Sequence, residues 1–379
     1  MRVVFDARHL QTQSRSRGIG RYSRNLLAAF ARQGPTDIDW TLLRLANFPS
    51  PGPVHAPPHR DRRTFRLRRP ELSMLALDPF LLSAELLGTG AQVFHSVQLG
   101  LPLARWKTRA VLTIHDLAPM HWPEHYLRLP HARVGHVWQY ALARFADAII
   151  AVSAHTKADV IARLGIPEER VHVIAEAVDA DFRPPGREAG RRVARERFGV
   201  EGRYVVYVGQ FDPRKNMDEL LRAFGAAAAT EPDLRLVIVG RLGKLASFLR
   251  QALERTRAPR ERIVVTDEVD EATLAALYAG AECLLHAALL EGFGLTPLES
   301  LAAGTPVVGY RAGAVAEVVG DAGLLVEPAT PGALAEALVA FLADPALADR
   351  LRARAASRAA LFSWDRAAAR TLDVYRAVG

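Results

Sequence analysis

Two glutamates, Glu291 and Glu299, stand eight residues apart on either side of a glycine-rich turn. An apolar run ending at His286 predicts a buried strand before them, and residues 298–303 predict a helix that ends at Gly304. A helix N-terminus approached by a flexible glycine turn presents unpaired amides to an anion. Two carboxylates beside a phosphate would repel it unless they face neutral hydroxyls attached to that phosphate, as in a sugar nucleotide. The alternative is a solvated loop acid followed by an ordinary surface glutamate.

A second candidate group, Gly209 to Asn216, follows the predicted strand 204–208. Within it, Arg214 and Lys215 could place two cations on a diphosphate, and an arginine can bind such a group in a bidentate fork. Positive side chains at the start of a helix oppose its dipole, so their position there predicts a local anion. The alternative is a basic turn on the surface.

Two further groups lie in the N-terminal half of the chain. Gly18 and Gly20 supply two glycines of the dinucleotide fingerprint, but Ser23 stands where the third is required, and no acid ends the next predicted strand. NAD binding is therefore poorly supported, and we interpret this stretch as a loop that offers backbone amides. His115 and Asp116 end a predicted strand, and a buried core histidine is the alternative interpretation.

Several chemistries lack the residues that they need. His121 and His125 have the spacing of metal ligands, but Pro123 prevents a regular helical pair and no third ligand is evident. The sequence has no Asp-x-Asp element at a strand end, no Gly-x-Ser-x-Gly and no P-loop, since residues 240–244 lack the required spacing and hydroxyl. We therefore expect no metal and no other cofactor.

Composition favours a globular protein with two domains in a reducing compartment. The chain has 379 residues, of which 50% are hydrophobic and 24% charged, and its one cysteine, Cys283, allows no internal disulfide. The sequence opens directly on a predicted strand without a signal peptide, and no apolar run approaches the ~18 residues that span a bilayer. We expect a cytoplasmic protein, with peripheral binding to the inner face of the membrane as an option.

The formal net charge of +8 favours acidic partners. Much of it lies in residues 60–69, which hold six arginines and one acid. Three interpretations of this segment stay open: a solvated loop, a nucleic-acid patch, or a patch for anionic lipid headgroups.

Short apolar runs alternate with helical patterns along the chain, which predicts α/β domains with parallel sheets. The first half contains six predicted strands, at 2–5, 41–45, 93–95, 110–114, 148–152 and 171–174. The second half contains six more, at 204–208, 236–239, 263–265, 283–286, 306–308 and 324–326. Each set is predicted to form one doubly wound domain, and a stretch rich in prolines and glycines separates the two.

Taken together, these motifs resemble the retaining glycosyltransferases of family 4. The C-terminal halves of that family carry a Glu-x7-Glu element, then small residues and Gly-Thr-Pro-Val-Val, which here are 291–299 and 304–308. The family's phosphate-binding loop is similar to residues 209–216, and its N-terminal elements are similar to 18–22 and 114–116. The resemblance spans nearly the whole chain.

The resemblance implies a GT-B fold, in which two Rossmann-like domains face each other across a cleft. It places an acceptor-side domain at 1–180, a linker at 181–202 and a donor-binding domain at 203–362. A last helix at 363–379 would pack back on the first domain. The chain departs from the family at residues 287–288, which are Ala-Ala where Pro-Ser is usual, and this change removes no obvious chemistry.

The resemblance also implies roles for individual residues. Glu299 would hold the ribose hydroxyls of the nucleotide, Glu291 would bind hydroxyls of the transferred sugar, and His115 would lie near the sugar and the diphosphate. Arg214 and Lys215 would neutralise the departing diphosphate, so that these two residues, Glu291 and His115 form the expected catalytic group. The remaining donor-binding residues would act through their backbone: Gly18, Gly20, Gly209, Gly292, Phe293, Gly294 and Leu295.

By resemblance, the chain is a metal-independent enzyme that moves a hexose from a nucleotide-sugar to a hydroxyl on a glycan or lipid-linked acceptor, as in polysaccharide biosynthesis. The N-terminal features resemble bacterial mannosyltransferases, so GDP-mannose is the first donor expected, followed by a UDP-sugar. Two alternatives stay open: a nucleotide-sugar 2-epimerase of the same fold, and a nucleic-acid-binding protein that uses the arginine-rich segment. The Glu-x7-Glu element favours the transferase, with an anionic membrane surface as a possible further partner and no nucleic acid.

Overall fold

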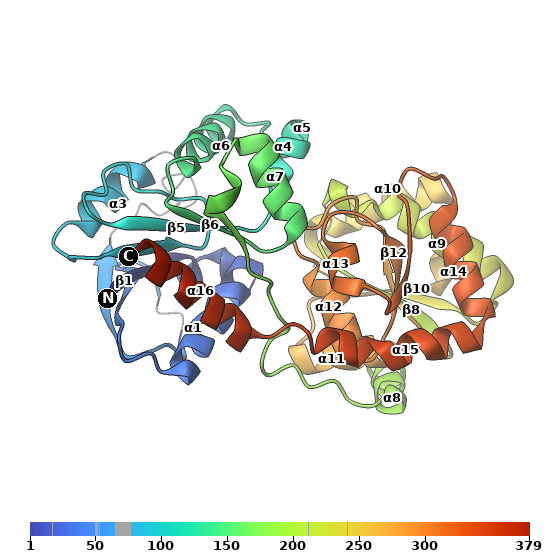
Figure 1. The fold of residues 1–379 in the computed structure, drawn as a ribbon. Coiled ribbons are helices and arrows are strands. Elements are labelled where there is room, and N and C mark those ends of the chain that lie inside the picture. The colour runs from blue at the N-terminus through green and yellow to red at the C-terminus, as the bar shows by residue number, and fades with distance from the viewer. Residues whose placement is uncertain (17, 50–51, 53, 65–76, 211, 241) are drawn as a thin grey trace. The chain divides into compact units, whose positions relative to one another are not determined.

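A computed structural model describes the chain from residue 1 to 379, except residues 17, 50–51, 53, 65–76, 211 and 241. The chain divides into two compact units, each built on a parallel sheet covered by helices (Figure 1). Unit 1 contains Met1–Asp179 together with Ser363–Gly379, and unit 2 contains Ala180–Phe362. The predicted α/β class with two doubly wound sheets is confirmed.

The sheet of unit 1 has the strand order β3-β2-β1-β4-β5-β6-β7, and all neighbouring strands are parallel. Its central strands are buried on both faces, as expected where crossover helices cover both sides of a parallel sheet. The strands are β1 (Arg2–Asp6), β2 (Asp39–Leu45), β3 (His59–Thr64), β4 (Val93–Ser96), β5 (Arg109–Ile114), β6 (Ala148–Ala151) and β7 (Val171–Val173).

Strand β3 was missed by the sequence prediction. It pairs with β2 along its whole length, but it lies at the edge of the sheet, and among its residues only Thr64 is buried. Arginines on an edge strand oppose pairing with another chain, which explains why the apolar pattern of a strand is absent here. The loop interpretation of residues 60–69 is therefore wrong for 60–64, and residues 65–69 lie outside the described part of the chain.

The C-terminal helix α16 completes unit 1 by packing on α1. Its Tyr375 is fully buried against Phe30 and Trp40, and the Tyr375 hydroxyl lies 2.5 Å from Nδ1 of His95. The helices of unit 1 are α1 (Gly18–Gln33), α3 (Asp78–Leu86), α4 (Ala118–His121), α5 (Pro123–Tyr126), α6 (Pro130–Ala143), α7 (Ala154–Leu164) and α16 (Trp364–Val378), with 3₁₀ turns η1 (Arg8–Gln11), η2 (Gln13–Ser16) and η3 (Glu168–Arg170).

The sheet of unit 2 has the strand order β10-β9-β8-β11-β12-β13 and is also parallel throughout. All six strands predicted for this half of the chain are confirmed within one or two residues at each end. They are β8 (Tyr204–Val208), β9 (Arg235–Val239), β10 (Ile263–Thr266), β11 (Leu284–His286), β12 (Val307–Tyr310) and β13 (Gly323–Val326).

The range 181–202, expected as a linker, contains a helix that is packed into unit 2. Helix α8 lies on α11, and the two backbones approach closely because Gly190 and Gly280 meet at the contact. The helices of unit 2 are α8 (Arg187–Phe198), α9 (Met217–Thr230), α10 (Leu242–Thr256), α11 (Glu271–Gly280), α12 (Leu295–Ala302), α13 (Val315–Val319), α14 (Ala333–Ala343) and α15 (Pro345–Ala359), with 3₁₀ turns η4 (Pro213–Lys215) and η5 (Arg260–Arg262). Within the described residues, no helix of either unit has the length and apolar character that crossing a bilayer requires.

Candidate functional site

The predicted motifs of unit 2 meet at one point of its sheet. Strands β8 and β11 are neighbours, and the strand order runs away from them in both directions, through β9 on one side and β12 on the other. Open α/β sheets bind ligands outside the carboxyl ends of the strands at such a switch point. The segment from Gly209 follows β8, and the segment 287–294 follows β11, so both leave the sheet at this switch point.

The turn η4 fixes the two predicted cations. Asp212 caps it by accepting a hydrogen bond from the backbone N–H of Arg214 at 3.1 Å, and Asn216 adopts a left-handed conformation that starts helix α9. The carbonyl of Arg214 in turn accepts a hydrogen bond from the N–H of Leu289 at 2.7 Å. This bond joins the two segments, so Lys215 is held against the glutamate loop. Phe211, part of the same motif, lies outside the described residues.

Three basic side chains surround the carboxylate of Glu291. Nζ of Lys215 donates a short hydrogen bond to Oε1, Nε2 of His286 lies 3.3 Å from the same oxygen, and Nη1 of Arg214 lies 3.9 Å from Oε2. The Glu291 side chain is only 9% exposed. The sequence prediction therefore chose three residues that the fold brings together, and it missed His286.

Burial and charge act in opposite directions on this group. Burial alone would raise the pKa of Glu291, but the positive charge of Lys215 and the contact with His286 outweigh it and hold the pKa well below its usual range. Burial lowers the pKa of His286, which favours a neutral ring at physiological pH. The site is therefore an ionised carboxylate held against cations in a largely buried position, where their charges act more strongly than in water.

The glycine turn leads from Glu291 into helix α12. Gly294 takes a positive φ of 104° as the residue before the helix, and no side chain caps this end. Gly313 lies directly against the backbone of Glu291, where a Cβ would collide, and Ala314 N–H donates to the Glu291 carbonyl at 2.9 Å. The turn is thus held by its neighbours while the uncapped N-terminus of α12 provides amides for an anion.

Several other predicted donor-site residues are buried or packed against neighbouring residues. Glu299 is almost fully buried, and its Oε2 accepts a hydrogen bond from the Tyr278 hydroxyl of α11 at 3.0 Å. The Phe293 ring packs edge-to-face on Phe362, with ring centroids 5.7 Å apart. Gly209 donates its N–H to the Val239 carbonyl at 3.1 Å and lies close to Gly240, where a Cβ would strike the Gly209 oxygen. Gly292 and Leu295 lie in the turn and at the start of α12.

The predicted residues of unit 1 form a separate group. His115 follows β5, and its ring is held by Glu176 at 2.9 Å from Nδ1, by the Val97 carbonyl at 3.1 Å from Nε2 and by the edge of Tyr22. Glu176 is a buried carboxylate that the sequence analysis did not single out, because no pattern marks it in a loop.

The prediction that Gly18 and Gly20 lie in a loop is wrong. Gly18 is the first residue of α1, and Gly20 lies in its first turn, where a Cβ would collide with the carbonyl oxygen of Ser14. Gly20 therefore allows a close backbone approach. The loop itself is the preceding segment with η1 and η2.

A buried ion cluster at the end of β1 was also missed. Arg8 donates two hydrogen bonds to Asp6 and two to Asp78, all at 2.7–2.8 Å, and all three side chains are buried. Burial would lower the pKa of Arg8, but the two carboxylates raise it well above its usual value. This cluster anchors the loop that leads into α1.

The histidine pair near α4 has other partners. Nε2 of His121 lies 2.6 Å from Asp159, and Nε2 of His125 lies 3.7 Å from Glu124. Across the described ranges, no group of three or more histidine, cysteine or acidic side chains is arranged to hold a metal ion.

Comparisons with known proteins cover both units. The family model "Glycosyltransferase Family 4" matches residues 16–182, and "Glycosyl transferases group 1" matches residues 192–358. A D-inositol 3-phosphate glycosyltransferase of Xylanimonas cellulosilytica is 32% identical over 292 residues, which are 73% of this chain and 68% of the relative. O-antigen chain mannosyltransferase B of Escherichia coli is 29% identical over 290 residues, 75% of this chain and 74% of the relative.

Solved structures share the fold at low sequence identity. Sucrose-phosphate synthase from Thermosynechococcus elongatus superposes with a TM-score of 0.77 at 22% identity, covering 100% of this chain and 99% of that one. The Anabaena protein HepE in complex with UDP-glucose superposes with a TM-score of 0.72 at 18% identity, covering 100% of both chains.

Proposed function

The chain belongs to the family 4 glycosyltransferases of the GT-B fold, and from this premise we propose that it is a retaining hexosyltransferase that uses a nucleoside diphosphate sugar. The main support is the group of Lys215, Arg214 and Glu291 at the carboxyl ends of β8 and β11, beside the uncapped N-terminus of α12. Cations and helix amides there match the charge of a diphosphate, and a buried carboxylate matches the hydroxyls of its sugar.

In the proposed reaction, the bond between the sugar C1 and the diphosphate oxygen breaks, and a bond forms from C1 to the acceptor oxygen. Lys215 and Arg214 stabilise the negative charge that develops on the leaving diphosphate. The proton of the acceptor hydroxyl passes to a leaving phosphate oxygen on the same face of the sugar, which retains the anomeric configuration. No enzymic nucleophile is required, so Glu291 has a positioning role.

We assign the two glutamates to different parts of the donor. Glu291 would accept hydrogen bonds from hydroxyls of the sugar, and its ion pair with Lys215 would hold the ammonium group ready for the diphosphate. Glu299 would accept the ribose hydroxyls, with Tyr278 fixing the orientation of its carboxylate. Amides from Gly292 to Leu295 would complete the phosphate contacts.

Two positive side chains supply charge that a divalent ion supplies in other sugar transferases. Lys215 and Arg214 lie within 4 Å of one carboxylate, and both sit on the short turn η4, so they can face one diphosphate together. We therefore propose transfer without a metal. Unchanged initial rates after EDTA treatment, with and without added Mg²⁺, would support this, and a rate restored only by the metal would contradict it.

Mannose is the first donor sugar to test, because O-antigen chain mannosyltransferase B and the serotype-specific mannosyltransferases WbdA of Escherichia coli are among the relatives. GDP-mannose is the corresponding nucleotide-sugar. UDP-glucose is the second, because HepE binds it in a structure of the same fold. The acceptor would be a hydroxyl of a glycan or a lipid-linked sugar, with His115 and its surroundings in unit 1 on the acceptor side.

A peripheral position on the cytoplasmic face of a membrane would bring the enzyme to a lipid-linked acceptor. Helix α6 and its flanks support this, because Val134, Val137, Trp138 and Phe145 are exposed on it. An aromatic and aliphatic helix face beside basic residues is the pattern of an interfacial helix. Co-sedimentation with vesicles containing anionic lipid tests this part of the proposal, and Trp138→Ala should reduce the bound fraction.

The donor site is tested by thermal unfolding of the purified protein with GDP, UDP, their mannose and glucose conjugates, and NAD. A ligand present at a hundred times its Kd stabilises the folded state by about 2.7 kcal/mol, which raises Tm measurably. We expect one nucleoside diphosphate and its sugar conjugates to raise Tm. This rise in Tm should be lost in Glu299→Ala and retained in Glu336→Ala, a control at an exposed helix position. A folded protein that responds to none of these ligands would contradict the proposal.

A further inference from the structure

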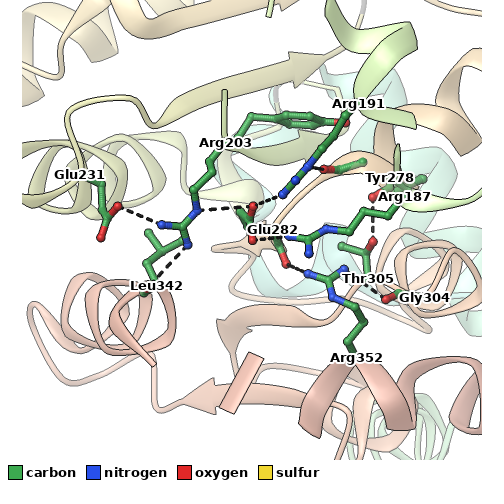
Figure 2. A network of polar contacts seen from close by, with 12 residues as sticks. Arg187, Arg191, Arg203, Glu231, Tyr278, Glu282, Gly304, Thr305, Leu342 and Arg352 are labelled. Carbon is green, nitrogen blue, oxygen red and sulfur yellow. Dashed lines mark hydrogen bonds and ion pairs between the residues drawn. The ribbon is translucent and has the colours of Figure 1, made fainter. Parts of the chain in front are cut away.

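A second group of cations lies at the opposite end of β11, around Glu282 (Figure 2). The Glu282 side chain is only 6% exposed and accepts hydrogen bonds at 2.6 Å from Nη2 of both Arg187 and Arg191. Nε of Arg203 lies 3.5 Å from the same carboxylate, and Nη2 of Arg352 donates to the Glu282 carbonyl at 3.1 Å. We call Arg187, Arg191, Arg203 and Arg352 the arginine cluster.

The fold brings these side chains together from distant parts of the sequence. Arg187 and Arg191 stand one helical turn apart on α8, so they project from the same face. Helix α8 can approach α11 closely because its Gly190 has no side chain at the contact. A Cβ on Gly190 would lie 2.5 Å from the carbonyl oxygen of Ala276 in α11. Arg203 precedes β8, and Arg352 comes from α15. Four segments of unit 2 thus converge at the amino ends of its two central strands.

The positive charge of the cluster is not balanced by its carboxylates. Besides Glu282, the cluster contacts one more acid, Glu231, which lies 3.0 Å from Nη1 of Arg203. Two carboxylates therefore face four guanidinium groups, so these six side chains together carry a net charge of +2. The side chains of Arg187 and Arg191 are 37% and 40% exposed, so an ion from solution can reach them.

Two donors of the cluster also lack an acceptor. Nε of Arg187 and Nε of Arg352 are both buried, and neither has a hydrogen-bond partner among the described residues. A buried donor without a partner is costly. Burial, followed by the charge of Arg187, lowers the pKa of Arg352, so the two guanidinium groups lie close enough to repel each other. An anion bound at the exposed guanidinium groups of Arg187 and Arg191 would supply the missing negative charge.

We propose that the arginine cluster binds a doubly charged anion of the phosphate class. Two unbalanced positive charges match a dianion, and planar guanidinium forks match the oxygens of a phosphate. From Glu282 to His286 the chain extends about 13 Å along the strand. This anion site is therefore distinct from the candidate donor site, and it does not depend on the proposed transferase activity.

The test measures binding of inorganic phosphate by isothermal titration and by thermal unfolding, at constant ionic strength with chloride as the replaced anion. We compare the wild type with Arg187→Gln, which removes one fork, and with Arg192→Gln, a matched control on the exposed side of α8, opposite buried Gly190 and Ala194. Lys215→Ala is included because phosphate could also enter the candidate donor site. Glucose 6-phosphate in a parallel titration separates free phosphate from a phosphomonoester as the ligand.

We expect saturable phosphate binding in the wild type, Arg192→Gln and Lys215→Ala, and at least tenfold weaker binding in Arg187→Gln. Arg187→Lys keeps the charge without the fork and should give an intermediate affinity. If Arg187→Gln does not fold, Arg352→Gln takes its place with the same expected loss. Equal binding by Arg187→Gln and the wild type, loss of binding in Lys215→Ala alone, or a response that chloride reproduces would each overturn the proposal.

Discussion

Strand β11 has a buried glutamate beyond each of its ends, and basic side chains surround both. At the amino end, Glu282 is held by arginines that come from packed helices. At the carboxyl end, Glu291 is held by Lys215 and Arg214, which sit on a short turn beside glycines and an uncapped helix. The same ion-pair chemistry is thus built once on rigid elements and once on loops. Rigid elements favour stability, whereas loops at a switch point leave room for a ligand.

The cations at the two ends also differ in how they can respond to the loss of the carboxylate. Lys215 has a flexible stem that can carry its charge into water when Glu291 is removed. The arginine cluster is fixed by several bonds at once, including the contact of Arg352 with the Glu282 backbone. We therefore expect the carboxyl end to control activity and the amino end to control stability.

The largest effect is expected from Lys215→Ala. It removes the cation closest to Glu291, and loss of one preorganised group that stabilises developing charge lowers kcat about 10²–10³-fold. The protein should still fold, because Arg214 and His286 remain beside Glu291, but with a lower Tm, because the buried carboxylate loses its closest cation. Initial rates of nucleoside diphosphate release measure the effect, with the exposed Lys107→Ala as control. Activity within a factor of three of the wild type would show that the carboxyl end has no such role.

The next effect separates the two glutamates by stability. Glu282→Ala removes the acceptor of two charge-assisted hydrogen bonds, from Arg187 and Arg191, and should lower the free energy of unfolding by about 3 kcal/mol. Glu291→Ala should cost about 1 kcal/mol or less, because it also removes the desolvation penalty of a buried carboxylate and because the flexible Lys215 can carry its charge into water. Urea unfolding of both variants beside Glu336→Ala measures the difference. Equal losses of unfolding free energy in Glu282→Ala and Glu291→Ala would contradict this prediction.

A smaller effect is expected from Glu291→Gln, which keeps the shape of the side chain and removes its charge. Turnover should fall about tenfold, since a charge-assisted hydrogen bond to the sugar becomes a neutral one. The nucleoside diphosphate alone should bind a few times more tightly, because Lys215 is no longer paired with a carboxylate and a negative charge has left the site. Titration calorimetry and steady-state rates measure the two changes. A weaker diphosphate complex would place Glu291 outside the donor site.

The smallest effect concerns pH. The lowered pKa of His286 means that its contribution to stability is present above about 6.5, its unfolded value, and is lost as the pH falls below that. The lowered pKa of Glu291 means that its contribution is lost only below the ordinary glutamate value of 4.5. Replacing His286 by asparagine should therefore reduce the fall in Tm between pH 6.5 and 4.5 relative to the wild type. Parallel Tm profiles of variant and wild type in that interval would contradict this.

The strands could be predicted from the sequence because apolar runs ending at polar residues mark buried parallel strands and their ligand-binding edges. The failure at β3 has a clear cause, because an edge strand made of arginines carries no apolar pattern. Glu291, Arg214 and Lys215 could be chosen in advance, since each follows a recognisable strand. The distances between these side chains could not be predicted. They depend on contacts that tertiary packing determines, such as the hydrogen bond from Leu289 N–H to the Arg214 carbonyl.

The arginine cluster was beyond prediction for a different reason. Its four members come from segments spread over more than 160 positions, and each one alone reads as an ordinary surface arginine. Only the close contact of Gly190 with α11 brings α8 to Glu282. Glu176 and His286 were missed similarly, because a single polar residue in a loop or at a strand end has many possible partners.

The position of α16 has a consequence for the order in which the chain acquires its structure during synthesis. Unit 2 is one continuous segment, whereas unit 1 needs Tyr375 to cover the contacting rings of Phe30 and Trp40. The ribosome delivers that helix only after all of unit 2 has been made. Unit 1 therefore lacks one aromatic side chain of its core until synthesis ends. Unit 2, although synthesised later, can complete its core before that.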